Sequence, residues 1–342
     1  MKAREGDLLQ TKDDFIFDVK GLSHPPNRTV AFPRFIPDPS GDRDSKGVTY
    51  KKIYKLSERY KFLETQLPSY LHFDPVFGTL LSEVPNADIR RHLNPIDHLE
   101  MLRRKGTNKL SVLENDALML LGHIRETANI PWNMLGISGS LLAQLATPES
   151  DIDPVVYGQR NSEKVHDAMN VIFTDEKNLI TSYTENQLRI LYDFRSKDTK
   201  MPFEAFVDIE NRKFLQGKFK QHDFYIRCVK DWDEIEEHYG NIRYKNTGYA
   251  RIEAVISDDS EVIFTPCRYL LDHVNFIQGV EVKGLCEIVS FRGRFCEQAR
   301  KGETVIAQGK IEKVAEKDGT THFRILLGGR TSDFMLLGRS PI

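Results

Sequence analysis

The spacing of apolar residues divides the chain into three parts of different character. The clearest helix is predicted over residues 107–128, where apolar positions recur every three or four residues. These positions are Leu110, Leu113, Ala117, Leu118, Leu121 and Ile124. Short apolar runs then alternate with helical patterns up to residue 235, which is typical of an α/β (α+β) core with a mixed sheet. We therefore expect a central domain over residues 106–235.

The N-terminal part, residues 1–105, has its own pattern of strands followed by helices. Three apolar runs with strand character are separated by polar segments. They lie at residues 15–19, 29–36 and 48–54. A helical pattern follows over residues 56–67 and stops at Pro68, and a second helix is expected after Pro95. These elements predict a separate α+β domain of unknown role.

The C-terminal part, residues 236–342, changes to the alternating pattern of β-strands. Asp318-Gly319 is a strong hairpin turn signal between the last two runs. The predicted strands cover residues 251–256, 261–267, 282–289, 304–314 and 321–327. Five strands in about a hundred residues predict a small β-barrel, comparable to an oligonucleotide-binding barrel.

One segment of the central domain carries candidate chemistry. Gly139-Ser140 opens a short helical stretch, and Asp151-Ile152-Asp153 follows eleven positions after the serine. Two carboxylates separated by one residue on a strand face the same side, where they repel unless cations lie between them. A Gly-Ser turn offers free backbone N–H groups to phosphate. A solvated edge strand is the alternative interpretation of an isolated Asp-x-Asp.

This Gly-Ser and Asp-x-Asp pattern resembles the signature of the DNA polymerase β-like nucleotidyltransferase superfamily, especially its small minimal members. The resemblance covers roughly residues 110 to 230. It implies transfer of a nucleoside monophosphate from an NTP to a hydroxyl acceptor. It also implies a third carboxylate on a later strand of the same sheet, for which Asp208 is the candidate within the run 203–209. Glu204 and Glu210 would share the face of that strand and are the alternatives.

The resemblance also implies the roles of the site residues. Asp151 and Asp153 would hold one or two Mg²⁺ (or Mn²⁺) ions, and Asp208 would complete the second metal site and receive the acceptor's proton. Gly139 and Ser140 would bind the β- and γ-phosphates. One of the nearby cations would neutralise triphosphate charge. These are Lys200, Arg212, Lys213, Lys218 and Lys220.

The composition limits the kinds of partner that are expected, but it does not identify the acceptor substrate. The 342 residues carry a net charge of −2, so nucleic-acid contact would depend on a local basic patch. No apolar run reaches the length of a membrane span, and the N-terminus lacks the apolar core of a signal peptide, so a cytoplasmic protein is expected. An RNA end, a protein side chain or a small molecule would each suit as acceptor. The competing hypothesis is a catalytically inactive, nucleotidyltransferase-like nucleic-acid-binding protein.

Overall fold

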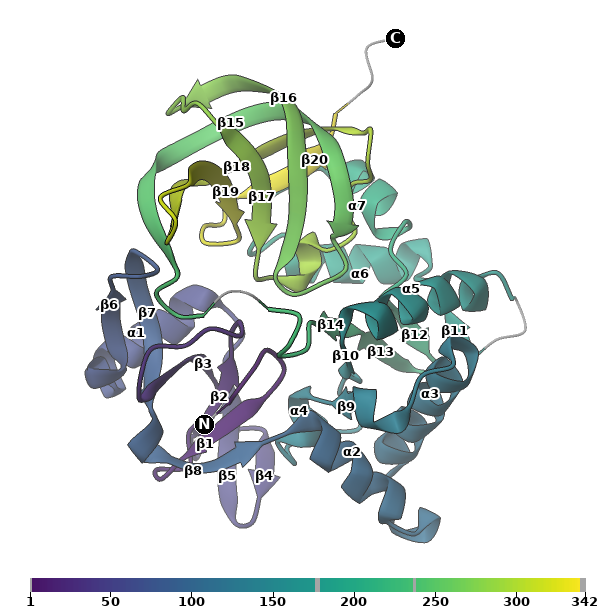
Figure 1. The fold of residues 1–342 in the computed structure, drawn as a ribbon. Coiled ribbons are helices and arrows are strands. Elements are labelled where there is room, and N and C mark those ends of the chain that lie inside the picture. The colour runs from purple at the N-terminus through teal and green to yellow at the C-terminus, as the bar shows by residue number, and fades with distance from the viewer. Residues whose placement is uncertain (1, 176–178, 236–237, 339–342) are drawn as a thin grey trace. The chain divides into compact units, whose positions relative to one another are not determined.

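The computed structural model describes residues 2–175, 179–235 and 238–338. The chain divides into two compact units, each formed by segments that are distant in sequence. The first comprises Met1–Phe73, Leu80–Thr181 and Leu215–Glu236. The second comprises Asp74–Thr79, Ser182–Phe214 and Glu237–Ile342. The architecture is mixed α+β with several separate sheets, shown by element in Figure 1.

The first unit begins with an N-terminal sheet whose two faces pack against different partners. Its main strand order is β4-β5-β3-β2-β1-β8, with β7 paired to β3 and β6 to β7. Phe17 and Val19 of β2 face Leu63 of helix α1 (Leu56–Gln66), as the period of two requires. The strands are β1 (Leu8–Thr11), β2 (Ile16–Val19), β3 (Arg28–Pro37), β4 (Arg43–Ser45), β5 (Val48–Lys52), β6 (Leu71–Asp74), β7 (Thr79–Pro85) and β8 (Ile89–Leu93).

The opposite face of this sheet covers part of the central core. Ile16 on β2, Phe35 on β3 and Tyr50 on β5 form one buried cluster with residues that follow Gly139 in sequence. The core residues of that cluster are Leu142, Ala143 and Leu145. Segments separated by about a hundred residues in sequence are therefore packed into one hydrophobic core.

A β-bulge interrupts strand β3 at Arg34. Ile16 pairs with Phe35 and Phe17 pairs with Pro33, so Arg34 is an extra residue opposite two consecutive partners. A bulge bends the strand and re-aims the side chain of the inserted residue. Arg34 thus leaves the strict alternation of the strand.

Helices α2 (Pro95–Arg104) and α3 (Val112–Ala128) confirm the two helices predicted on either side of residue 106. Asn94 caps α2 by accepting from the backbone N–H groups of Ile96 and Asp97. Ser111 and Glu114 form a capping box at the start of α3, which explains why this helix begins later than residue 107. Within the described ranges, no helix is long and apolar enough to cross a membrane.

The central core of the first unit contains two small sheets. Strand β10 lies between β9, to which it is antiparallel, and β14, to which it is parallel. Buried Val165, Met169 and Ile172 line one side of helix α5 (Gln159–Phe173). A short helix, α4 (Gly139–Leu142), follows β9. The strands are β9 (Leu135–Ile137), β10 (Pro154–Tyr157) and β14 (Arg227–Val229), and in the second sheet β11 (Ile180–Thr181), β12 (Gln216–Phe219) and β13 (His222–Tyr225).

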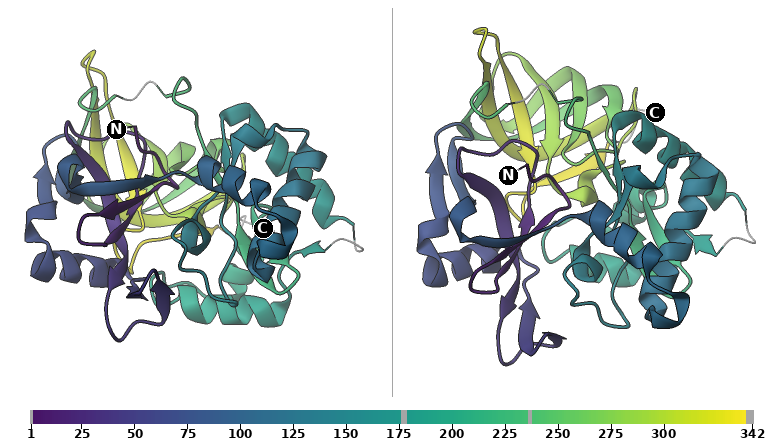
Figure 2. Two further views of the ribbon diagram at one scale, coloured as in Figure 1. Left: turned by 90° about the horizontal axis from the view of Figure 1, so that it is seen from below. Right: turned by 60° about the horizontal axis from the view of Figure 1, so that its bottom comes forward.

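The second unit is dominated by one strongly curved sheet, drawn in green and yellow in Figure 2. Its order is β15-β16-β17-β19-β18-β20, and an additional β15–β18 pairing closes a ring of five strands. Asp318-Gly319 turns the β18–β19 hairpin as predicted. The strands are β15 (Ile242–Glu261), β16 (Cys267–Gly279), β17 (Leu285–Ser290), β18 (Thr304–Glu316), β19 (Thr321–Leu327) and β20 (Phe334–Leu337).

Two helices complete the second unit, and one of them corrects a strand prediction. Residues 203–209 lie in helix α7 (Phe203–Glu210), which follows α6 (Glu185–Arg195). Phe206 and Ile209 are buried at the helical spacing of three, and Tyr192 of α6 makes an edge-to-face contact with Phe206. A short apolar run without internal turn residues suits a strand or a buried helix equally, and packing against α6 decides for the helix.

Candidate functional site

The Gly-Ser turn and the aspartate pair meet just before the start of strand β10, which begins at Pro154. Ile137 pairs with Pro154 across β9 and β10, and the N–H of Ser138 donates to the carbonyl of Asp153 at 2.9 Å. Gly139 follows with φ of +64°, and a Cβ atom on it would lie 1.8 Å from Oδ2 of Asp153. Only glycine allows both this conformation and this approach. The two motifs, ten residues apart in sequence, are therefore in contact.

Asp151 and Asp153 flank a buried residue and lie on the other face from it. Ile152 is buried and forms a parallel bridge with Phe224, which is also buried. Strand β10 begins only at Pro154, which has no N–H to donate to a partner strand. Burial and the Asp151 carboxylate raise the pKa of Asp153 to about 6. A cation bound between the two carboxylates would oppose this shift.

The oxygen ligands at this position suit Mg²⁺. Among residues 2–175, 179–235 and 238–338, no three His, Cys, Asp or Glu side chains gather as a ready metal site. Mg²⁺ commonly binds through one or two carboxylates, completed by water and substrate phosphates, so the pair Asp151 and Asp153 is a sufficient protein contribution. Ser140 beside them is 1% exposed, and its Oγ has no hydrogen-bond partner in the described structure. A buried hydroxyl without a partner is unusual.

Comparison with known proteins gives a relationship over nearly the whole chain. A protein of Methanocaldococcus jannaschii, described as uncharacterized protein MJ1086, is 33% identical over 336 residues, which cover 96% of each chain. The chain belongs to the MJ1086 family. No family model matches this MJ1086-family chain, and no solved structure matches it.

In this member of the MJ1086 family, Asp208 lies on a helix and not on a strand. It is an exposed residue of helix α7 and belongs to the second unit, whereas Asp151 and Asp153 belong to the first. Glu204 is exposed on the same helix. Glu210 is buried and forms ion pairs with Arg195 at 2.6 Å and Lys213 at 2.8 Å. The expectation that these acids share a strand face is wrong, because residues 203–210 are helical.

A different carboxylate, Asp223, occupies the neighbouring strand of the first unit. The N–H of Ile152 donates to the carbonyl of Asp223 at 2.9 Å, and the Ile152–Phe224 bridge places Asp223 next to Asp151 in register. Since Phe224 is buried, Asp223 faces the same side as the aspartate pair, and its side chain is 56% exposed. The alternation in His222-Asp223-Phe224-Tyr225 is the signal that could have located it, because it predicts a short strand that includes Asp223.

Most of the lysines and arginines proposed from sequence already pair with carboxylates. Carboxylates lie close to four of the five. The pairs are Arg212–Glu303, Lys213–Glu210, Lys218–Asp223 and Lys220–Asp116. Three cations, Lys52, Arg227 and Arg34, act to lower the pKa of Asp153 against its burial. Lys52 and Arg34 come from the N-terminal sheet, and Arg227 comes from strand β14. The amino-acid pattern gave no indication of this contribution.

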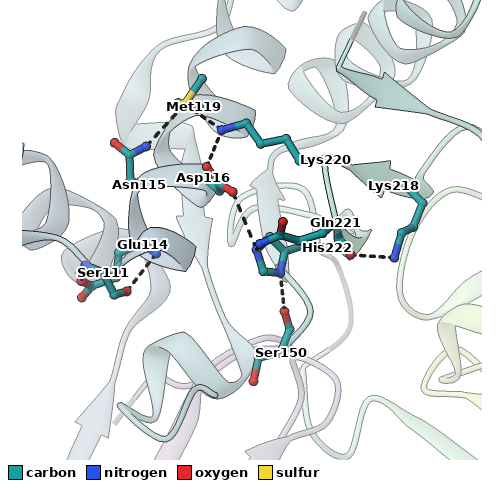
Figure 3. Close-up of polar contacts among 10 residues, drawn as sticks. All are labelled: Ser111, Glu114, Asn115, Asp116, Met119, Ser150, Lys218, Lys220, Gln221 and His222. Atoms are coloured by element: carbon teal, nitrogen blue, oxygen red, sulfur yellow. Dashed lines mark hydrogen bonds and ion pairs between the residues drawn. The ribbon is translucent and has the colours of Figure 1, made fainter. Parts of the chain in front are cut away.

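A buried polar chain supports the backbone that carries the acids (Figure 3). His222 Nδ1 lies 3.2 Å from the carbonyl of Ser150, the residue before Asp151. His222 Nε2 is 3.7 Å from the buried carboxylate of Asp116 on α3, which Lys220 also contacts at 2.6 Å. Ser150 Oγ accepts from the N–H of Thr147 at 2.9 Å and so closes the turn before the aspartates. These polar contacts hold the backbone at Ser150 and so fix the position from which Asp151 projects.

Proposed function

We propose that this protein is a metal-dependent nucleotidyltransferase, which transfers a nucleoside monophosphate from an NTP to a hydroxyl acceptor. The observation that carries the proposal is the contact of Gly139 with the Asp153 carboxylate, within a pair of acids that share one face. A solvated edge strand would not need a glycine in a left-handed conformation against its second aspartate. This arrangement matches the requirement of phosphoryl transfer for positioning and charge stabilisation.

Asp151 and Asp153 would hold the Mg²⁺, and the third acid would be Asp223 in place of Asp208. When bound, the metal would supply charge neutralisation at the phosphates and make the acceptor hydroxyl more acidic. Asp223, exposed beside Asp151, is suited to take the proton of that hydroxyl. Gly139 and Ser140 would contribute backbone N–H groups to phosphate oxygens.

The transfer is a substitution at phosphorus and needs no oxidant or reductant. The acceptor oxygen forms a bond to the α-phosphorus as its proton passes to Asp223. The bond between the α-phosphorus and the bridging oxygen breaks, and the electron pair leaves with pyrophosphate. The chain's task is to align the attacking oxygen and hold the charges of the leaving group.

Label transfer tests this proposal. The full chain is incubated with each α-labelled NTP, Mg²⁺ or Mn²⁺, and a panel of RNA, protein and small-molecule acceptors. We expect transfer that the Asp151→Asn and Asp153→Asn variants lose. Asp167→Asn is the matched control, because Asp167 is an exposed carboxylate on α5 of the same unit. Transfer that persists in both site variants would refute the proposal.

The second candidate function is an inactive nucleotidyltransferase-like protein that binds nucleic acid. The ring of five strands favours it, since small five-stranded barrels of the oligonucleotide-binding type bind single strands. Arg330 stacks 4.0 Å from the ring centroid of Tyr249 on β15, the kind of basic and aromatic pair that nucleic-acid surfaces use. A salt-dependent shift of RNA without any label transfer would select this function.

A further inference from the structure

Lys52 is a nearly buried cation next to the aspartate pair. Its side chain is 7% exposed, and Nζ lies 4.0 Å from Oδ1 of Asp151. That separation is too long for a hydrogen bond, and no other carboxylate of the described residues pairs with Nζ. Nζ also lies 4.9 Å from the ring centroid of Tyr54. An ammonium group has three donors, so this one has hydrogen-bonding capacity left for a ligand.

The fold explains why the Lys52 side chain points to the core. Lys52 pairs with Phe35 across β5 and β3, and Tyr50 lies two residues earlier on the same face. Phe35 and Tyr50 belong to the cluster that packs against Leu142 and Ala143, directly after the Gly139 turn. Lys52 therefore shares the apolar face of the sheet with Phe35 and Tyr50, and it places a positive charge where that face approaches the aspartate pair.

Arg34, the bulge residue of β3, lies near the same tyrosine as Lys52. Its guanidinium carbon lies 5.6 Å from the ring centroid of Tyr54, the ring that Lys52 also contacts. Within the described ranges, Arg34 forms no ion pair with a carboxylate. Tyr54 is 45% exposed, so the two cations lie at an edge that a solute can reach.

We propose that Lys52 and Arg34 of the N-terminal sheet bind the polyphosphate of the nucleotide and the pyrophosphate that leaves. This inference rests on the proposed function, and it gives the N-terminal sheet a role in that reaction. A single bound Mg²⁺ neutralises only part of the negative charge of an NTP, and Lys and Arg are the usual partners of phosphate oxygens. Lys52 beside Asp151 is placed to contact an anion and a metal ligand together.

Calorimetric titration of the full chain with inorganic tripolyphosphate and Mg²⁺ tests the inference without any acceptor. We expect Lys52→Gln and Arg34→Gln each to weaken binding by at least about tenfold, since each removes one charged hydrogen-bonding partner. Lys51→Gln is the matched control, because Lys51 precedes Lys52 but is exposed on the other face of β5. Lys52→Arg should retain most of the affinity, and melting curves verify that each variant is folded.

The outcomes separate this inference from the proposed function. If the wild type binds tripolyphosphate and only the Lys52 and Arg34 variants weaken it, the inference stands, whether or not an acceptor has been found. A second outcome is label transfer with Lys52 and Arg34 variants that match the Lys51→Gln control in their affinity for tripolyphosphate and in their KM for NTP. In that case the inference is overturned and the proposed function stands. If the wild type neither binds tripolyphosphate nor transfers label, both are refuted.

Discussion

Gly139 touches Asp153 so closely that no side chain fits between them: a Cβ atom would lie 1.8 Å from Oδ2. We expect Gly139→Ala to abolish nucleotidyl transfer, because the carboxylate must move away from the position that the metal requires. The left-handed backbone adds a cost of roughly 1–2 kcal/mol to the folding of this variant. Label transfer and thermal unfolding measure the two effects.

Gly47 supplies the control for that experiment. It has φ of +80° in the turn between β4 and β5, and nothing lies within 4 Å of a Cβ built on it. Gly47→Ala should therefore lose a similar amount of stability and keep its activity. Equal activities of the two alanine variants would show that the contact with Asp153 is unimportant.

The third carboxylate can be assigned by comparing two variants. Asp223→Asn should lower the transfer rate by a factor of about a hundred or more, as expected for loss of a group that takes a proton in the reaction. Asp208→Asn, on an exposed face of helix α7, should leave the rate unchanged. The measurement is the single-turnover rate at saturating NTP. The reverse result would assign the role to Asp208.

His222 is expected to act by positioning Ser150 rather than by contacting substrate. Its Nδ1 lies 3.2 Å from the Ser150 carbonyl, and Asn retains a donor at about this position whereas Leu does not. His222→Leu should lower kcat by about tenfold with little change in KM, in line with supporting groups around metal sites, and His222→Asn should restore most of it. A loss that is the same in both variants would indicate only a packing role.

His98 gives a stability prediction that is independent of catalysis. Burial lowers the pKa of His98 on α2 to about 4, and its Nε2 has no hydrogen-bond partner in the described structure. The folded state thus binds the proton less readily than the unfolded state, whose pKa is 6.5. The free energy of unfolding should be constant with respect to this group above pH 6.5 and decline as the pH falls toward 4. The loss at pH 5 should be about 2 kcal/mol.

Urea denaturation at pH 7.5 and pH 5 measures that difference. His98→Leu removes the titrating group at similar volume and should lose this part of the pH dependence. If the variant and the wild type lose the same stability between the two pH values, His98 is not the group responsible.

Local signals were sufficient for much of the fold. The helix over residues 56–67 was predicted from an apolar pattern ended by Pro68, and it spans Leu56–Gln66. The hairpin at Asp318-Gly319 was equally clear, because its turn chemistry is encoded in two adjacent residues. Strand β16 was not predicted, since register shifts and the positive φ of His273 break its alternation.

The candidate site was predictable only in part. Gly139, Asp151 and Asp153 lie within fifteen residues, and their contact follows from one tight connection between two strands. Lys52 and Arg34 were missed because their approach depends on a sheet formed a hundred residues earlier and on a bulge that no local pattern reveals. The strand predicted around Asp208 is a helix, because the packing of α7 against α6, rather than its own sequence, decides its structure.

The cluster shared by the N-terminal sheet and the segment that begins with α4 sets a limit on how small this protein can be made. A fragment of residues 106–235 would carry Asp151, Asp153 and Asp223 but would leave Leu142, Ala143 and Leu145 facing water. It would also lack both cations that approach the acids from β3 and β5. The segment that resembles a minimal nucleotidyltransferase shares a hydrophobic core with the N-terminal sheet inside one compact unit, so a stable fragment would need both.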